Sequence, residues 1–357
     1  MNKKILTGIL AGVMAFGSFG NFDVEAATRA EISAVQVKKS GNFKYWNKDS
    51  ETLAALKNYV KDITNKSSKN FIPVEDRIAV FDMDGTFLCE TAPYYFEWML
   101  YLERALYDKD YNPSRETRDY ARAIEAGIRK TGEFPQGVDV GEAKAQEAVF
   151  AGLTPAEYEA YVKRFMEKPV EGLANLKWGE AFYLPMVEVI KYLQANGFSV
   201  YVVSGSDRPT VRILVSELLN ISPGNVIGSD PKIIAAGQGD TDGLDYVYGK
   251  KDYLVRGELI EKNLKMNKVS VIAQEIGKQP VLAFGNSGGD ASMLNYAVYG
   301  NKYKSAAFFV LCDDLTREFG NLEKAEKCKK LAAENGWTPI SMRDDFKTIY
   351  GENVKKN

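Results

Sequence analysis

The chain has 357 residues, 45% hydrophobic and 26% charged, which is an ordinary soluble composition and enough chain for a large core or two domains. Its 46 basic and 48 acidic side chains give a net charge of -2, so charge gives no reason to expect binding to nucleic acid or to an anionic membrane. The chain has no histidine, which excludes imidazole catalysis and imidazole metal ligands and leaves acid–base chemistry to carboxylates, Lys, Tyr or Cys.

The first 26 residues have the pattern of a secretory signal. Lys3 and Lys4 precede an uncharged run over residues 5–20, and Val24 and Ala26 occupy the small-residue positions before Ala27. We therefore expect a signal peptide over 1–26, export to the periplasm or the outside of the cell, and no stable membrane association once the signal is removed. An uncleaved anchor is the alternative.

Residues 27–72 predict an N-terminal helical extension that packs beside the core. Its helical pattern is a single apolar stripe. The stripe consists of Leu53, Leu56, Tyr59, Val60 and Ile63.

The first strand signal ends in two carboxylates. The apolar run 78–81 predicts a buried parallel strand, and Asp82, Asp84 and Gly85 follow it. Because side chains alternate along a strand, Asp82 and Asp84 are expected on one side, where both could reach one reacting group. Two such anions need either a shared divalent cation with oxygen ligands or a division of roles between carboxylate and acid. A plain Asp-Gly turn is the alternative reading.

Residues 90–184 predict helices without a strand. Tyr94, Tyr95 and Trp98 belong to an apolar helix face typical of a core, and Thr154 with Pro155 begins a capped helix. A helical insert directly after the strand that carries the carboxylates suits a lid that excludes water.

An alternating strand and helix pattern resumes after residue 185. A strand over 199–203 leads into Ser204 and Gly205, which predict an anion site at the start of the next helix. A short strand is expected over 225–228, followed by a surface loop. A helix begins at Lys268, and a strand over 281–284 leads into Asn286 and Asp290.

The C-terminal part continues with a strand over 306–311, a helix from Asn321 to Gly336 and a strand over 337–342. Cys312 and Cys328 could pair in an oxidising compartment, but we favour small core residues, because a fold of this size needs no disulfide.

Four motifs in this order resemble the haloacid dehalogenase superfamily. They are Asp-x-Asp-Gly-Thr after one strand, Ser-Gly after a second, a lone lysine at a helix start, and Gly-Asn-x-x-Gly-Asp after a third. The position of the helical insert is closest to the phosphoserine-phosphatase-like branch. The resemblance implies a three-layer α/β/α Rossmann-like core with a parallel sheet, over 73–89 and 185–357, and an all-helical cap over 90–184.

The resemblance also implies a role for each motif residue. Asp82 would attack phosphorus and form an aspartyl phosphate, and Asp84 would protonate the leaving oxygen and then activate water. Phosphate would bind to Ser204, Gly205, Lys268 and Thr86. Mg²⁺ would bind to Asp82, Asp84, Asn286 and Asp290.

Three features depart from the family pattern. Asn286 stands where the family usually has Asp, so the metal should bind more weakly or through water. A substrate-reading Glu is offset by one position from Glu90, and Lys265 rivals Lys268 as the motif lysine. We name Glu90, Arg208 and Arg212 as candidates for contacting the leaving group.

The sequence thus predicts an exported, Mg²⁺-dependent phosphomonoesterase for a small phosphorylated metabolite, with phosphoserine among the candidates and no nucleic-acid partner. The alternatives are a catalytically silent phosphate-ligand binding protein and a phosphotransferase of the same superfamily. A dehalogenase is disfavoured, because it needs no general acid at Asp84. The oligomeric state is left open.

Overall fold

The computed structural model describes residues 26–357, so the predicted signal peptide lies almost wholly outside the described residues. Within this range no helix is both long and apolar enough to span a bilayer.

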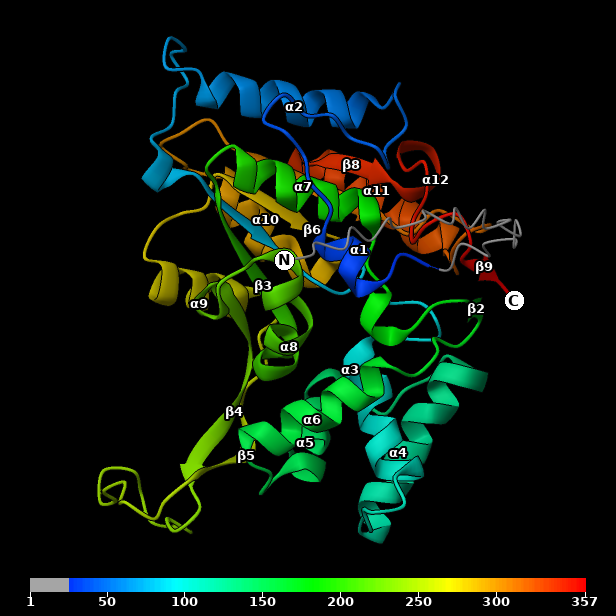
Figure 1. Cartoon of the computed structure of the whole chain (residues 1–357), viewed down its shortest axis with the longest axis vertical. Helices are drawn as coiled ribbons and strands as arrows, with labels where there is room; N and C mark the ends of the chain where they lie inside the picture. The colour runs from blue at the N-terminus through cyan, green and yellow to red at the C-terminus, as the bar shows by residue number, and fades with distance from the viewer. Residues whose placement is uncertain (1–25) are drawn as a thin grey trace, which may run out of the picture.

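Seven strands of the described chain form one mostly parallel sheet, and the strand with the two aspartates lies at its centre (Figure 1). In order across the sheet, the strands are β5 (Leu254–Glu261), β4 (Val226–Ala235), β3 (Ser199–Asp207), β1 (Ile78–Phe81), β6 (Leu282–Gly285), β7 (Ala306–Leu311) and β8 (Thr338–Ser341). Only β5 runs antiparallel to its neighbour. The predicted α/β fold is confirmed.

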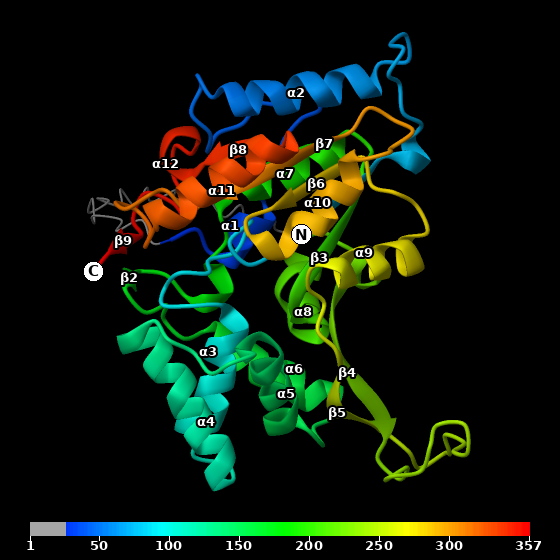
Figure 2. The ribbon, with the colours of Figure 1, turned by 180° about the vertical axis from the view of Figure 1, so that it is seen from behind.

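Strand β1 is buried on both faces, because its residues alternate between two helical layers. Ala79 and Phe81 belong to one apolar cluster, with side chains of α2, α7 and α8, and Ile78 and Val80 belong to a second, with side chains of α10 and α11. Figure 1 shows α7 in front of the sheet, and Figure 2, from behind, shows α10 and α11. The result is a three-layer core.

The helices of these two layers have the following bounds. The first layer holds α1 (Arg29–Ser33), α2 (Glu51–Thr64), α7 (Leu184–Ala195) and α8 (Arg208–Leu219). The second holds α9 (Met266–Val271), α10 (Ala291–Val298) and α11 (Leu322–Asn335), and the short α12 (Met342–Asp345) follows β8. Cys312 and Cys328 are buried in the second cluster as free thiols.

Four helices follow β1 in the chain and lie together beyond the ends of the strands (Figure 1). They are α3 (Phe96–Leu102), α4 (Arg115–Ala126), α5 (Val138–Phe150) and α6 (Pro155–Met166). The predicted capping box at Thr154 is confirmed. The prediction that no strand interrupts this region is wrong, because β2 (Leu173–Ala174) pairs with β9 (Lys355–Lys356). Two residues are too few to leave a periodic signal. The domain boundaries given above stay a prediction.

The region after residue 225 also differs from expectation. Instead of a short strand and a loop, β4 continues to Ala235 and pairs with β5 in a hairpin that projects from the body (Figure 1). Arg256 of β5 anchors the hairpin, because its guanidinium lies 2.5 Å from Glu147 of α5 and 3.0 Å from Asp207. Pro231 and Gly257 interrupt the strand pattern in the sequence, and for this reason the sequence does not predict the hairpin.

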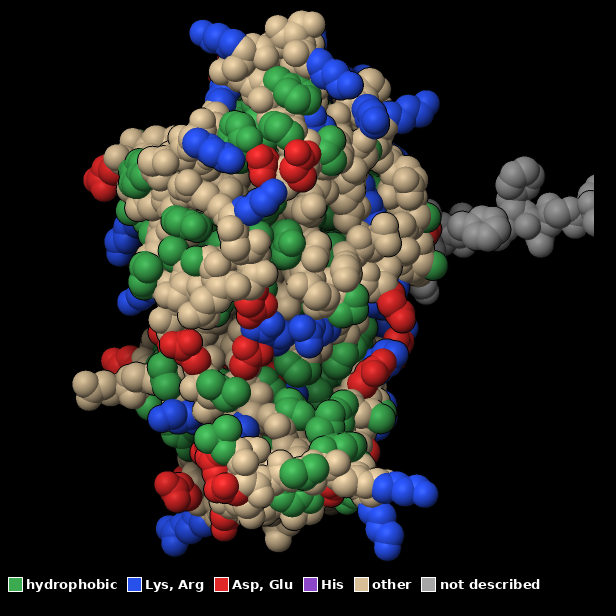
Figure 3. Space-filling view, turned by 90° about the vertical axis from the view of Figure 1, so that its left-hand side faces the viewer, with side chains coloured by type: hydrophobic (Ala, Val, Ile, Leu, Met, Phe, Trp, Pro, Cys, Tyr) green, Lys and Arg blue, Asp and Glu red, His purple; other side chains and the backbone are tan. Residues whose placement is uncertain are grey.

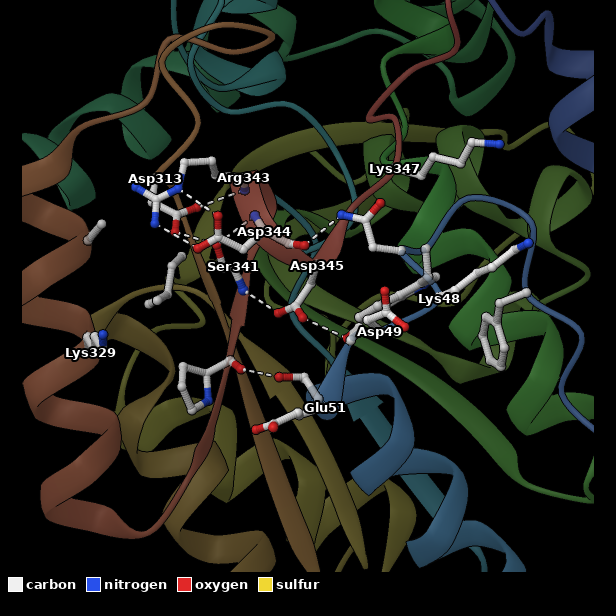
Figure 4. Close-up of a pocket in the computed structure, with 18 of the residues that line it drawn as sticks. Lys48, Asp49, Glu51, Asp313, Lys329, Ser341, Arg343, Asp344, Asp345 and Lys347 are labelled. Carbon is white, nitrogen blue, oxygen red and sulfur yellow. Dashed lines mark hydrogen bonds and ion pairs between the residues drawn. The ribbon is translucent and has the colours of Figure 1, made fainter.

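A large cavity, about 1380 Å³, lies between the start of α2, α11 and the α12 region (Figure 4). It shares no residue with the predicted motifs, and several of its polar groups bond to one another: Asp345 accepts from Ser50 at 2.6 Å, and Asp313 accepts from Ser341 at 2.6 Å. On the face in Figure 3, basic and acidic side chains are interspersed. Cavity size and surface charge therefore do not identify the functional site. The predicted site residues lie instead at the carboxyl ends of the strands.

Candidate active site

Asp82 and Asp84 line one cavity at the carboxyl end of β1. The Asp82 N–H donates to the Phe284 carbonyl of β6 at 2.9 Å, which continues the sheet by one residue. Both side chains are largely buried, with 6% and 9% of their surface exposed. The alternation along the strand has brought the two carboxylates to the same cavity, as the sequence predicts.

The turn after Asp84 depends on Gly85. Its φ of +78° lies in the region that favours glycine, and a Cβ there would stand 1.9 Å from the Asn286 side-chain nitrogen and 2.4 Å from the Glu90 carboxyl carbon. The next residue, Thr86, is fully buried and donates its hydroxyl to Asp82 Oδ2 at 3.2 Å. Thr86 thus orients the first carboxylate.

Lys268 is the lysine of the site. Its ammonium lies 2.6 Å from Asp82 Oδ1 and 2.7 Å from Asp290 Oδ1, and the side chain is fully buried. Burial disfavours the charged form of Lys268 and by itself would lower its pKa. The neighbouring carboxylates of Asp290 and Asp82 outweigh this effect, so the pKa of Lys268 is raised. Lys265 is exposed and does not line the cavity.

The turn after β6 supplies the other two predicted residues. Asp290 Oδ2 accepts from the backbone N–H groups of Asn286 and Ser287, each at 3.0 Å, so this carboxylate also holds the turn in shape. Asn286 lines the cavity with its side chain against Gly85.

The environments of the two aspartates separate their roles. Burial and the neighbouring Asp290 raise the pKa of Asp82 to about 7, against the effect of Lys268. Burial and the neighbouring Asp82 raise the pKa of Asp84 well above its usual range. Ser206 donates to Asp84 Oδ2 at 2.8 Å, and Asp84 Oδ1 has no hydrogen-bond partner among the described residues. Asp84 is therefore suited to carry a proton beside an ionised Asp82.

The structure places Ser204 differently from expectation. Ser204 is fully buried and outside the cavity lining, and its hydroxyl accepts from the Ser206 N–H at 3.0 Å. Gly205 and Ser206 line the cavity instead. The sequence pattern ends the strand at Val203, whereas β3 continues to Asp207, so the cavity is reached by Ser206 near the true end of the strand and not by Ser204.

Helix α3, its neighbours and the end of β5 form the opposite wall. The residues of this wall are Glu90, Tyr95, Glu97, Trp98, Asp139, Lys262 and Leu264. Glu90 was a predicted candidate, and it pairs with Lys324 at 2.7 Å. The sequence pattern indicates only a core role for Tyr95 and Trp98. It gives no signal for Glu97 within its apolar helix or for Lys262, which follows β5 where a surface loop is expected. The cavity is partly open to solvent and has a volume of about 100 Å³.

Two predicted arginines lie elsewhere. Arg208 pairs with Asp230 at 2.7 Å and with Glu275 at 2.6 Å, and Arg212 donates to the Pro223 carbonyl at 3.0 Å. Neither lines the cavity, although Arg208 directly follows the end of β3.

The donor set of the cavity suits a hard divalent cation. Among residues 26–357, no cluster of three or more His, Cys, Asp or Glu side chains could by itself hold a metal. The carboxylates of Asp82 and Asp290 and the amide oxygen of Asn286 nevertheless are oxygen donors on residues that line one cavity. A set with so few protein ligands fits a cation that keeps several waters, as Mg²⁺ does.

The chain is similar to several solved structures at low sequence identity. No curated protein matches the sequence. A protein of unknown function from Bordetella pertussis Tohama I is 18% identical, with a TM-score of 0.46, and the match covers 74% of this chain and 97% of that one. Cytosolic 5'-nucleotidase IIIB bound to cytidine is 12% identical, with a TM-score of 0.49, and the match covers 82% and 86%.

A probable phosphoserine phosphatase from Vibrio cholerae is 14% identical, with a TM-score of 0.38, and the match covers 76% of this chain and 62% of that one. At the sequence level, residues 79–295 match the family described as haloacid dehalogenase-like hydrolase. That segment begins in β1 and ends in α10, so it spans the two aspartates, Lys268 and Asp290. The chain belongs to the haloacid dehalogenase-like hydrolases.

Proposed function

We propose that the protein is a phosphomonoesterase that passes the phosphoryl group through Asp82 to water. The observation that carries this proposal is the pair of buried carboxylates, one held by Lys268 and Thr86 and the other by Ser206, in a single small cavity. Phosphoryl transfer needs a nucleophile, a proton donor and cationic groups around the phosphoryl oxygens, and this cavity provides them.

The reaction would use the two aspartates in turn. A carboxylate oxygen of Asp82 forms a bond to phosphorus while the bond to the leaving oxygen breaks, and Asp84 gives its proton to that oxygen. Water then attacks the aspartyl phosphate, Asp84 takes the proton of the water, and phosphate leaves with Asp82 restored. The raised pKa of Asp84 suits the first step, since the residue must hold a proton at neutral pH.

Lys268 and a metal would share the remaining charge. The Lys268 ammonium contacts both Asp82 and Asp290, so it stabilises the ionised form of each carboxylate. It would also offset the negative charge of the incoming phosphate. Mg²⁺ would be held by Asp82, the Asp84 carbonyl, Asn286 and Asp290, and when bound it neutralises phosphoryl oxygens.

The test of the reaction is a panel of small phosphomonoesters, assayed with and without Mg²⁺. Asp82→Asn and Asp84→Asn should each lose activity by about 10³-fold or more, whereas the surface variant Asp240→Asn should keep it. A phosphoryl adduct on the peptide that contains Asp82, seen by mass spectrometry after quenching, would identify the nucleophile. Turnover near the wild-type rate in Asp82→Asn would exclude Asp82 from that role.

Export is a separate part of the proposal, supported by the pattern of residues 1–26. The intact mass of protein recovered outside the cytoplasm should correspond to a chain that begins at Ala27. A mass that still includes Met1 would contradict signal cleavage.

A further inference from the structure

We propose that the leaving group of the substrate is a small alcohol that carries a positively charged ammonium group and no anionic group. This inference rests on the proposed function and adds the class of substrate. It comes from the wall of the cavity that faces Asp84, where the leaving group would lie.

The charges of this wall are mostly negative. Glu90, Glu97 and Asp139 line it, and Lys262 is the one cation among the described residues that lines it, while Lys324, outside the lining, pairs with Glu90 at 2.7 Å. Lys262 lies 3.7 Å from Glu97, beyond hydrogen-bond distance. Burial opposes the charge of Lys262, and Glu97 and Glu142 raise its pKa, so this lysine is already engaged with carboxylates. Asp139 makes no ion pair within the described chain. The wall therefore favours a further cation.

Two aromatic rings complete the wall. Tyr95 and Trp98 both line the cavity, with ring centroids 6.0 Å apart and ring planes at 65°. Trp98 is held in place by Tyr94 at 4.8 Å and by Phe134 at 5.6 Å. Two aromatic faces at an angle, with carboxylates beside them, are the arrangement that binds alkylammonium groups in proteins.

The same wall disfavours a substrate with an anionic leaving group. No arginine of the described chain lines the cavity, so a carboxylate would find no bidentate partner there. The carboxylate of phosphoserine would instead meet Glu90, Glu97 and Asp139.

The test compares substrates of similar shape and different charge. Phosphocholine carries a quaternary ammonium, 3,3-dimethylbutyl phosphate is its neutral carbon counterpart, and phosphoserine adds a carboxylate. In the wild type we expect kcat/KM for phosphocholine or phosphoethanolamine to exceed that for the neutral ester by about tenfold or more, as a desolvated cation over an aromatic face allows. Phosphoserine should be the poorest of the four.

Variants then locate the preference. Glu97→Gln and Asp139→Asn should lower the ratio of kcat/KM for phosphocholine to kcat/KM for the neutral ester, and Trp98→Leu should reduce this ratio further. Asp110→Asn, an exposed change outside the cavity, should leave the ratio as it is. Asp139 is itself exposed, so its variant tests the idea even if Glu97→Gln folds poorly.

The outcomes separate the two levels of the proposal. Equal turnover of the neutral and cationic esters, or a preference for phosphoserine, would overturn the substrate class and leave the phosphatase intact. A lack of turnover of all four esters in the presence of Mg²⁺ would overturn the proposed function together with this inference.

Discussion

The ammonium of Lys268 donates a 2.6 Å hydrogen bond to Asp82, and both groups are buried beneath the same cavity. A charge-assisted hydrogen bond of this kind is strong in a low-dielectric site. Lys268 also contacts Asp290, so the same ammonium reduces the repulsion between the two carboxylates.

We predict that Lys268→Met lowers kcat/KM by about 10²- to 10³-fold, since the variant removes a preorganised cation at the phosphoryl group. Lys265→Met is the matched control, because that lysine lies three positions earlier with an exposed side chain. Steady-state kinetics with one ester decide the case. An equal loss in both variants would mean that the helix start, rather than the Lys268 charge, matters.

We predict that Gly85→Ala reduces both activity and stability, because the new Cβ would collide with the side chains of Asn286 and Glu90. Gly277→Ala provides the comparison: its φ of +68° carries a similar backbone cost of about 1 kcal/mol, yet no atom lies within 4 Å of its Cβ position. Thermal unfolding should separate the two variants. If both lose the same stability and activity, the close approach at Gly85 has no role beyond its backbone angle.

The sequence predicts those site residues that lie close to one another along the chain. Asp82 and Asp84 share a strand end, and Asn286 and Asp290 share a turn, so alternation and turn chemistry place each pair. Helix phase favours Lys268 over Lys265, and the structure places the Lys268 side chain, not that of Lys265, beside Asp82 in the cavity.

The missed residues depend on contacts that are remote in the sequence. Lys262 reaches the cavity because β5 pairs antiparallel with β4, a pairing with irregular register and no alternating pattern. Glu97 lies among apolar residues of α3, so its burial is visible only once the neighbouring helices are placed. Arg208 was expected in the cavity, but its acidic partners come from β4 and from the segment after α9.

We predict a pH-dependent stability contribution from Glu188, which accepts the backbone N–H groups of Lys44 at 2.6 Å and Tyr45 at 2.9 Å. Burial raises its pKa from 4.5 to about 7. Between these values the unfolded chain has lost the proton and the folded chain keeps it. The contribution of Glu188 therefore falls as the pH rises from about 4.5 to 7, by at most about 3 kcal/mol.

Unfolding of wild type and Glu188→Gln at pH 5 and pH 8 measures this effect. The free energy of unfolding of the wild type should drop relative to the variant between the two values, because glutamine does not titrate. Glu326→Gln, an exposed change, should run parallel to the wild type. Parallel curves for Glu188→Gln as well would show that its pKa is not raised.

The last prediction concerns the metal, where this chain departs from its family. Asn286 is 4% exposed, lines the cavity and lies against Gly85, so an aspartate of the same shape could take its place without new contacts. The amide offers an oxygen without charge, and a hard cation prefers an anionic oxygen. Asn286→Asp should therefore lower the Mg²⁺ concentration for half-maximal activity by about tenfold, and Asp290→Ala should raise it steeply.

A stability measurement adds a readout that does not depend on turnover. Without Mg²⁺, the new carboxylate near Asp82 and Glu90 should lower the melting temperature of Asn286→Asp, and added Mg²⁺ should restore it more than in the wild type. Asn321→Asp is the control, because Asn321 caps α11 outside the cavity and aspartate caps a helix equally well. Identical Mg²⁺ titrations of wild type and Asn286→Asp, by activity and by melting, would place Asn286 away from the metal.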